Sequence, residues 1–200
     1  MLKLREQQRK KQEQAAAAAA AAKANAGESN GTNGESSPSS RVSSAQALLQ
    51  KHLTELELPK STNIEFPDPK DFFNFKLVIS PAGGYYSKGS FTFTVEVTQN
   101  FPFEPPKVKC NNKIYHPNID LEGNVCLNIL REEWRPVLSI NSVVMGLNHL
   151  FLEPNPNDPL NKQAANTFVK DIDQFKRNVS ISMSGGYVDR VYFDDVRFRR

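Results

Sequence analysis

The segment YHPNIDLEGNVCLNIL, residues 115–130, holds the most informative residues of this chain. It lies in a longer stretch, residues 111–138, that is rich in apolar side chains but follows neither the period of a helix nor that of a strand. An apolar irregular segment of this length must lie against the core, and long ordered loops are often functional. Within it, Cys126 follows His116 and Asn118, and this combination makes Cys126 a candidate thiol nucleophile.

The residues alone leave two other interpretations of Cys126. The first is a small buried hydrophobe between Val125 and Leu127, since free cysteine is often buried. The second is a zinc ligand together with Cys110 and His116, but these residues lack the paired close spacing of zinc sites. The sequence therefore predicts no metal site.

Two runs of alternating apolar and polar residues precede this segment, at 73–79 and 91–97. A period of two predicts strands with one buried face. The turn-forming sequence PAGGYYSKG, residues 81–89, separates the two runs and indicates an antiparallel meander. A further short strand is expected at 107–110, directly after a pair of prolines.

Helical periodicity flanks the strands on both sides. Apolar residues recur at helical spacing from Ala45 to Leu56, after serines that can cap the helix and before Pro59. A second helix is expected at 139–153, and a weaker helix or pair of helices at 162–183. The predicted fold class is α+β: a helix, a small antiparallel sheet, an irregular functional segment and then helices.

The composition describes one domain of ordinary size with some excess chain. The 200 residues include 25 basic and 22 acidic side chains, and the formal charge of +3 is too slight to argue for nucleic acid. No run approaches the roughly 18 consecutive apolar residues that a membrane helix needs. Two cysteines cannot form a disulfide framework and fit a reducing compartment, so the chain is expected to be intracellular.

The first 40 residues differ in composition from the rest. Every aromatic residue lies at or beyond Phe66, while residues 1–40 contain a basic head, an alanine run that favours helix, and a Gly/Ser/Asn-rich stretch typical of linkers. We predict a disordered docking extension at 1–40 before a core domain at 41–200. The alternatives are a solvated tether that docks nowhere and a targeting peptide, which Glu6 and Glu13 oppose.

Three separate motifs resemble those of the ubiquitin-conjugating enzyme family. They are FPFEPPKVKC at 101–110, a His-Pro-Asn turn with a cysteine eight residues after the asparagine, and EPNPNDPLN at 153–161. The resemblance covers roughly residues 45–183. The stretch NVCLNILREEWRPVLSIN and the opening MLKL are most similar to members that serve the neddylation (RUB) pathway. The resemblance implies the ubiquitin-conjugating fold, with an N-terminal helix, a four-stranded antiparallel meander and further helices.

The resemblance also implies two acyl transfers. The C-terminal glycine of a ubiquitin-like modifier passes from a cysteine of the activating enzyme to Cys126, and from there to a lysine of a target protein. Cys126 is then the nucleophile, expected to lie open to solvent, and no cation adjoins it in sequence to depress its pKa strongly. Exchange between similar thioesters is nearly thermoneutral, so no cofactor is expected to be bound, and ATP is consumed upstream by the activating enzyme.

Two further residues receive roles from the resemblance. Both transfers pass through a tetrahedral oxyanion, and the side-chain amide of Asn118 is the expected donor. Alternatively, Asn118 ties down its own turn. Asp158 matches the acidic position beside the acceptor channel, where it would orient the lysine amine and accept its proton. Alternatively, it caps the next helix. His116 is interpreted as structural.

Partners follow from the same resemblance: a heterodimeric activating enzyme, a RING-type ligase with a co-ligase, and cullin substrates. The residues expected to bind partners are the opening ones, whose acetylated first residue engages the co-ligase, and polar residues of the first helix: Met1, Leu2, Leu4, Gln46, Gln50 and Lys51. The protein is expected to be a monomer of the cytoplasm or nucleus that binds neither nucleic acid nor membrane. The alternatives are a conjugating enzyme for ubiquitin itself and a non-catalytic scaffold of the same fold.

Overall fold

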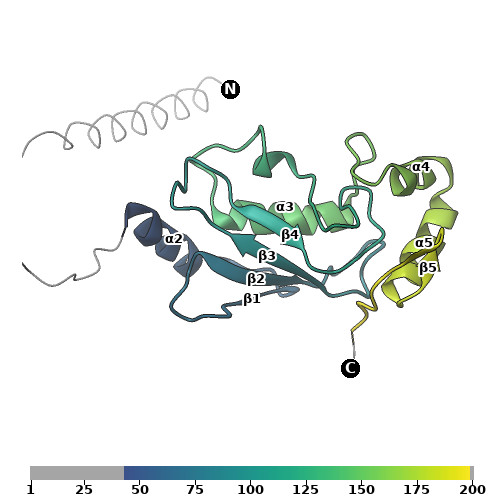
Figure 1. Ribbon diagram of the computed structural model, residues 1–200, viewed down its shortest axis with the longest axis horizontal. Helices are drawn as coiled ribbons and strands as arrows, with labels where there is room; N and C mark the ends of the chain where they lie inside the picture. The colour runs from purple at the N-terminus through teal and green to yellow at the C-terminus, as the bar shows by residue number, and fades with distance from the viewer. Residues whose placement is uncertain (1–42, 199–200) are drawn as a thin grey trace, which may run out of the picture. The chain divides into compact units, whose positions relative to one another are not determined.

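The computed structural model describes residues 43–198 (Figure 1). Helices and strands follow one another in the order expected for an α+β fold, with the sheet between the first helix and the later helices. In chain order the elements are α2 (Ser44–Thr54), β1 (Thr62–Glu65), β2 (Asn74–Ile79), β3 (Phe91–Glu96), β4 (Lys107–Cys110), the 3-10 turn η1 (Asn128–Leu130), α3 (Ile140–Leu152), α4 (Lys162–Lys170), α5 (Ile172–Met183), β5 (Tyr187–Val188) and β6 (Val191–Tyr192).

Strands β1 to β4 form one antiparallel sheet in the order of the chain. Between β2 and β3, Phe75 lies opposite Val95 and Leu77 lies opposite Phe93. Because successive side chains of a strand point to opposite faces, these four residues share one face, and all four are buried. The four-stranded antiparallel meander is therefore confirmed.

Helix α3 packs against this buried face of the sheet. Its N-cap Ser139 accepts a hydrogen bond from the N–H of Ser142, which satisfies one of the free donors at the helix start. The ring of Phe151 on α3 stacks on Phe91 of β3 with the ring centroids 4.4 Å apart. Figure 1 shows α3 running along the sheet, with α2 near one end of the sheet and α4, α5 and β5 beyond the other.

The predicted helices and strands are confirmed, with differences at their ends. Helix α2 ends at Thr54, before the last apolar position of the pattern, and the region 162–183 forms two helices. Alternation of side chains did not identify β1 or the β5–β6 hairpin. These strands have four, two and two residues, too few for a period of two to stand out.

Two further expectations concern the N-terminal residues and the absence of a membrane-spanning helix. The proposed docking residues Met1, Leu2 and Leu4, with the rest of 1–40, lie outside the described residues. Within residues 43–198, every helix is too short or too polar to cross a membrane.

Candidate active site

The irregular segment that carries the site contains a tight turn around Asp120. Its carboxylate accepts hydrogen bonds from the backbone N–H groups of Glu122 and Asn124 and from the Asn124 side chain. Gly123 adopts a φ of +86°, and its carbonyl accepts a hydrogen bond from the N–H of Cys110 at 2.8 Å. The turn is thereby joined to the end of β4.

His116 fixes the adjoining turn to helix α3. Its Nδ1 accepts a hydrogen bond from the N–H of Asn118 at 2.9 Å, so Nε2 carries the proton and donates to the carbonyl of Leu150 at 3.0 Å. Burial lowers the pKa of His116 to about 4, so the ring is neutral at neutral pH. The contacts agree with the structural role inferred from the sequence.

Asn118 joins this turn to the loop that carries Asp158. The residue is 1% exposed. Its Oδ1 accepts from the N–H of Asn155 at 2.8 Å, and its Nδ2 donates to the carbonyls of Asn155 at 2.7 Å and Asp158 at 3.2 Å. Its backbone carbonyl accepts from the N–H of Cys126 at 2.8 Å. Since Nδ2 is engaged by two carbonyls, the predicted oxyanion role requires one of these hydrogen bonds to be exchanged during the reaction.

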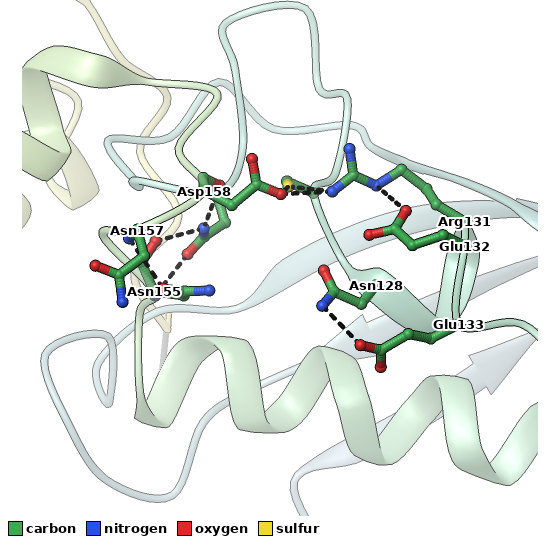
Figure 2. A network of polar contacts seen from close by, with 9 residues as sticks. Asn128, Arg131, Glu132, Glu133, Asn155, Asn157 and Asp158 are labelled. Atoms are coloured by element: carbon green, nitrogen blue, oxygen red, sulfur yellow. Dashed lines mark hydrogen bonds and ion pairs between the residues drawn. The ribbon is translucent and has the colours of Figure 1, made fainter.

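The sulfur of Cys126 lies between Asp158 and Arg131, whose side chains point toward each other in Figure 2. Sγ donates to Oδ2 of Asp158 at 2.9 Å and accepts from Nη2 of Arg131 at 2.9 Å, and these two side chains pair at 2.6 Å. Cys126 is 5% exposed, so the expectation of an open sulfur is wrong for this state. The two polar side chains that contact the sulfur, Asp158 and Arg131, are themselves 57% and 43% exposed. These polar contacts also oppose the interpretation of Cys126 as a packed hydrophobe.

These contacts set the ionisation of the site. Burial, followed by the hydrogen bond to Asp158, raises the pKa of Cys126 to about 11, whereas the charge of Arg131 acts to lower it. The hydrogen bonds from Cys126 and Arg131 lower the pKa of Asp158. At neutral pH the site therefore holds a neutral thiol between a carboxylate and a guanidinium, which agrees with the expectation that the thiol is not strongly acidified.

An open cavity of about 530 Å³ is lined in part by Cys126. This volume lies within the range of ligand sites. Figure 2 shows Asn128 and Glu133 on the side of the site opposite Asn155, and their side chains form a hydrogen bond of 3.1 Å. The cavity is lined by the turn after the cysteine, by the C-terminal half of α3 and by the loop after it: Cys126, Leu127, Asn128, Ile129, Glu133, Gly146, His149, Leu150, Glu153, Pro154, Asn155, Pro156 and Asp158.

Asp158 does not cap the following helix. Helix α4 begins at Lys162, and its N-cap is Asn161, whose side chain accepts from the N–H of Ala164 at 3.0 Å. The capping interpretation of Asp158 is therefore wrong. Its carboxylate faces Cys126 instead.

Arg131 was not among the residues expected at the site. It stands five positions after Cys126, and no cation adjoins the cysteine in sequence. The 3-10 turn η1 reverses the chain: the N–H of Leu130 donates to the carbonyl of Leu127, and the N–H of Arg131 donates to the carbonyl of Asn128. A turn prediction directly after the cysteine was the one available signal.

The expected partner-binding residues of α2 differ in exposure. Lys51 is exposed and lies 4.0 Å from Glu55, while Gln46 and Gln50 are half-buried. Across residues 43–198, no three His, Cys, Asp or Glu side chains gather closely enough to hold a metal ion.

Comparisons with known proteins agree with the motifs. A family model described as "Ubiquitin-conjugating enzyme" matches residues 48–183. The "Nedd8-conjugating enzyme UbcE2M" of Drosophila melanogaster is 56% identical over 154 residues, which cover 77% of this chain and 85% of the relative. The "NEDD8-conjugating enzyme UBC12" of Yarrowia lipolytica is 56% identical over 156 residues, which cover 78% and 87%.

A solved structure is similar over nearly its whole length. The structure titled "S. cerevisiae Ubc12" is 40% identical, with a TM-score of 0.76, over 98% of this chain and 97% of that one. The resemblance inferred from three motifs is therefore confirmed at the level of sequence and fold. The chain belongs to the ubiquitin-conjugating enzyme family.

Proposed function

We propose that this protein accepts the ubiquitin-like modifier NEDD8 from its activating enzyme as a thioester on Cys126 and transfers it to lysines of target proteins, with cullins as the expected targets. One observation carries the proposal. Cys126 lines an open cavity and its sulfur lies 2.9 Å from the Asp158 carboxylate, in a chain that is 56% identical to enzymes named for NEDD8 conjugation.

The first transfer exchanges one thioester for another. The sulfur of Cys126 attacks the carbonyl carbon of the modifier's C-terminal glycine, the bond to the activating enzyme's cysteine breaks, and that thiolate leaves with the electron pair. The thiol proton of Cys126 passes to Asp158 or to solvent. The reaction needs neither a metal nor a nucleotide at this site, because ATP has already been consumed upstream.

The second transfer requires a neutral amine, and the ordinary pKa of lysine is about 10.4. A carboxylate alone stabilises the ammonium form, so any lowering of the lysine pKa must come from desolvation. Asp158 then orients the amine and accepts its proton as the C–N bond forms. For Asn118 we retain the role of oxyanion donor as part of the proposal, with one Nδ2 hydrogen bond moved from a loop carbonyl to the oxyanion.

The remaining partners are assigned to the surface and the tail. Residues 1–40 form a docking extension before the catalytic domain at 41–200, with Met1, Leu2 and Leu4 binding the heterodimeric activating enzyme and Met1 binding the co-ligase. The first helix of the domain supplies a second contact, so that two weak sites on one chain act together. A RING-type ligase brings the substrate, and the monomer acts in the cytoplasm or nucleus.

One experiment tests the reaction. The protein is incubated with ATP and each pair of activating enzyme and modifier, NEDD8 or ubiquitin, and run on a non-reducing gel. A thiol-labile adduct with NEDD8 that is absent in Cys126→Ala and present in Cys110→Ala supports the proposal. Cys110 is the matched control because it is also a buried free cysteine. An adduct with ubiquitin alone selects the other conjugating enzyme, and no adduct with either selects the non-catalytic scaffold.

A further inference from the structure

We propose that Arg131 is a catalytic residue that binds the sulfur of Cys126 whenever that sulfur carries negative charge, first as the attacking group and later as the leaving group. The inference rests on the proposed function, but the contact between Arg131 and Cys126 is observed without modifier or activating enzyme. Neither the motifs nor the family match assigned Arg131 a role.

The geometry places three groups in mutual contact. Nη2 of Arg131 lies 2.9 Å from Sγ of Cys126 and 2.6 Å from Oδ2 of Asp158, and Sγ lies 2.9 Å from the same Oδ2. In the described part of the chain, Arg131 is the one cationic side chain within hydrogen-bond distance of the sulfur. Its other charged neighbour is Glu132, at 3.7 Å from Nε, which opposes its effect on the thiol.

Deprotonation of the thiol changes what each neighbour does. In the neutral state the S–H group donates to the Asp158 carboxylate. Once the proton has left, a thiolate and a carboxylate would stand 2.9 Å apart with like charge, and Asp158, being exposed, can turn into solvent. Arg131 then keeps a charge-assisted N–H···S⁻ contact, because a guanidinium presents several donors and stays protonated.

The same contact acts when the lysine is modified. The amine nitrogen attacks the thioester carbonyl, the C–S bond breaks, and the electron pair of that bond remains on the sulfur of Cys126. The ammonium proton passes to Asp158, and the thiolate is received by the N–H of Arg131 until it is protonated by solvent. Arg131 neither gains nor loses a proton, so the step balances without a further reactant.

Alkylation of the intact protein tests the contact without modifier or activating enzyme. The rate of reaction of Cys126 with iodoacetamide is measured from about pH 7 to pH 10, and peptide mass spectrometry separates Cys126 from Cys110. We expect Arg131→Gln to react about three- to tenfold more slowly than the parent at neutral pH, which corresponds to an upward pKa shift of up to about one unit. Arg131→Lys is expected to recover part of the rate.

Arg135→Gln is the matched control. Its guanidinium binds the backbone carbonyls of Glu132 and Trp134 and has no contact with the sulfur, so the rate should equal that of the parent. Equal rates in Arg131→Gln and the parent would overturn the proposal. Thermal unfolding of each variant confirms that the protein is folded, as expected for a side chain that is 43% exposed.

A double variant separates direct action from positioning. If Arg131 acts on the sulfur itself, Arg131→Gln slows alkylation in an Asp158→Asn background as well. If it only holds Asp158 in place, the effect disappears in that background and the proposal fails. Since no modifier is present, this failure is distinguishable from a failure to form the NEDD8 thioester on the gel.

Discussion

The side chain of Asn118 and the backbone of Asn155 hold each other by a reciprocal pair of hydrogen bonds: Oδ1 accepts from the N–H and Nδ2 donates to the carbonyl, at 2.8 and 2.7 Å. A side-chain amide in this position replaces the backbone partner that the loop would otherwise lack. Because Asn118 also binds the N–H of Cys126 through its own carbonyl, the cysteine and the Asp158 loop are positioned by one residue.

Removing this amide should weaken both the fold and the site. Asn118→Ala leaves the N–H and carbonyl of Asn155 without partners, so the free energy of unfolding should fall by about 1–3 kcal/mol in urea titrations. Asn111→Ala, at an exposed asparagine whose amide oxygen binds Thr94, should change it little. Amide hydrogen exchange at Asn155 separates the roles: if exchange is unchanged while transfer to lysine is lost, Asn118 acts on the oxyanion rather than on the loop.

A side chain at Gly123 should destabilise the turn before the cysteine. A Cβ there would lie 2.0 Å from the carbonyl oxygen of Cys110, and its φ of +86° disfavours any L-residue with a Cβ. We expect Gly123→Ala to lower the free energy of unfolding by about 2–4 kcal/mol, the sum of backbone strain and overpacking. In Gly83→Ala, where a Cβ meets nothing within 4 Å, the midpoint of urea unfolding should barely move. Equal midpoints for the two variants would contradict the geometry.

The carboxylate of Asp158 should be needed for transfer to lysine more than for acceptance of the modifier. Proton acceptance by a positioned base contributes about 10²–10⁴-fold, so Asp158→Asn should discharge its thioester to free lysine at least about a hundredfold more slowly. Glu153→Gln provides the control, because this carboxylate lines the same cavity without touching Cys126. Discharge is followed in single turnover after the activating enzyme is quenched. If Glu153→Gln discharges as slowly as Asp158→Asn, the negative charge of the cavity matters and the position of Asp158 does not.

His116 should make the protein less stable as the pH falls below about 6.5. Its pKa is about 4 in the folded protein, because burial disfavours the charged ring, so between these two values the unfolded chain binds a proton that the folded chain does not. The free energy of unfolding should drop by about 3 kcal/mol from this group across that interval. Urea titrations at several pH values give the free energy of unfolding at each pH. In His116→Asn this free energy should change less with pH than in the parent.

The extension and the first helix should act together in acceptance of the modifier. Deletion of residues 1–40 should lower the rate of thioester formation by about tenfold or more at limiting activating enzyme, because two linked contacts are reduced to one. Lys51→Glu in the full chain should cause a smaller loss. Replacing residues 24–40 by a Gly/Ser linker of equal length should leave the rate unchanged, since the linker only spans the two contacts. Full activity of the deletion variant would show that the tail does not dock.

The helices and strands that could be predicted are those long enough to show a periodic pattern of apolar side chains. Strands β2 and β3 and helix α3 are long enough for side chains to alternate or recur on one face, and these faces form the core. Strand β1 and the β5–β6 hairpin could not be found in this way, because a strand of two to four residues shows at most one repeat and is defined by its partner.

For the site, spacing in the sequence identified only residues that lie close together in the chain. His116, Asn118 and Cys126 share one loop, and Asp158 was recognised through its motif although it lies 32 residues from the cysteine it contacts. The choice between Asp158 and Asn161 as helix cap depended on where α4 begins, which a sequence fixes only to within a few residues. Arg131 was not found because its contact with the sulfur depends on the short 3-10 turn that lies between the two residues.

The high pKa of Cys126 affects how well the enzyme resists oxidation between catalytic cycles. With a pKa of about 11, roughly one molecule in 4,000 carries a thiolate at about pH 7.4, and peroxides attack thiolates far faster than thiols. An idle molecule is thus chemically quiet and resists conversion to sulfenic acid. Burial and the hydrogen bond to Asp158 therefore protect the resting thiol, whereas Arg131 favours the charged sulfur that reacts.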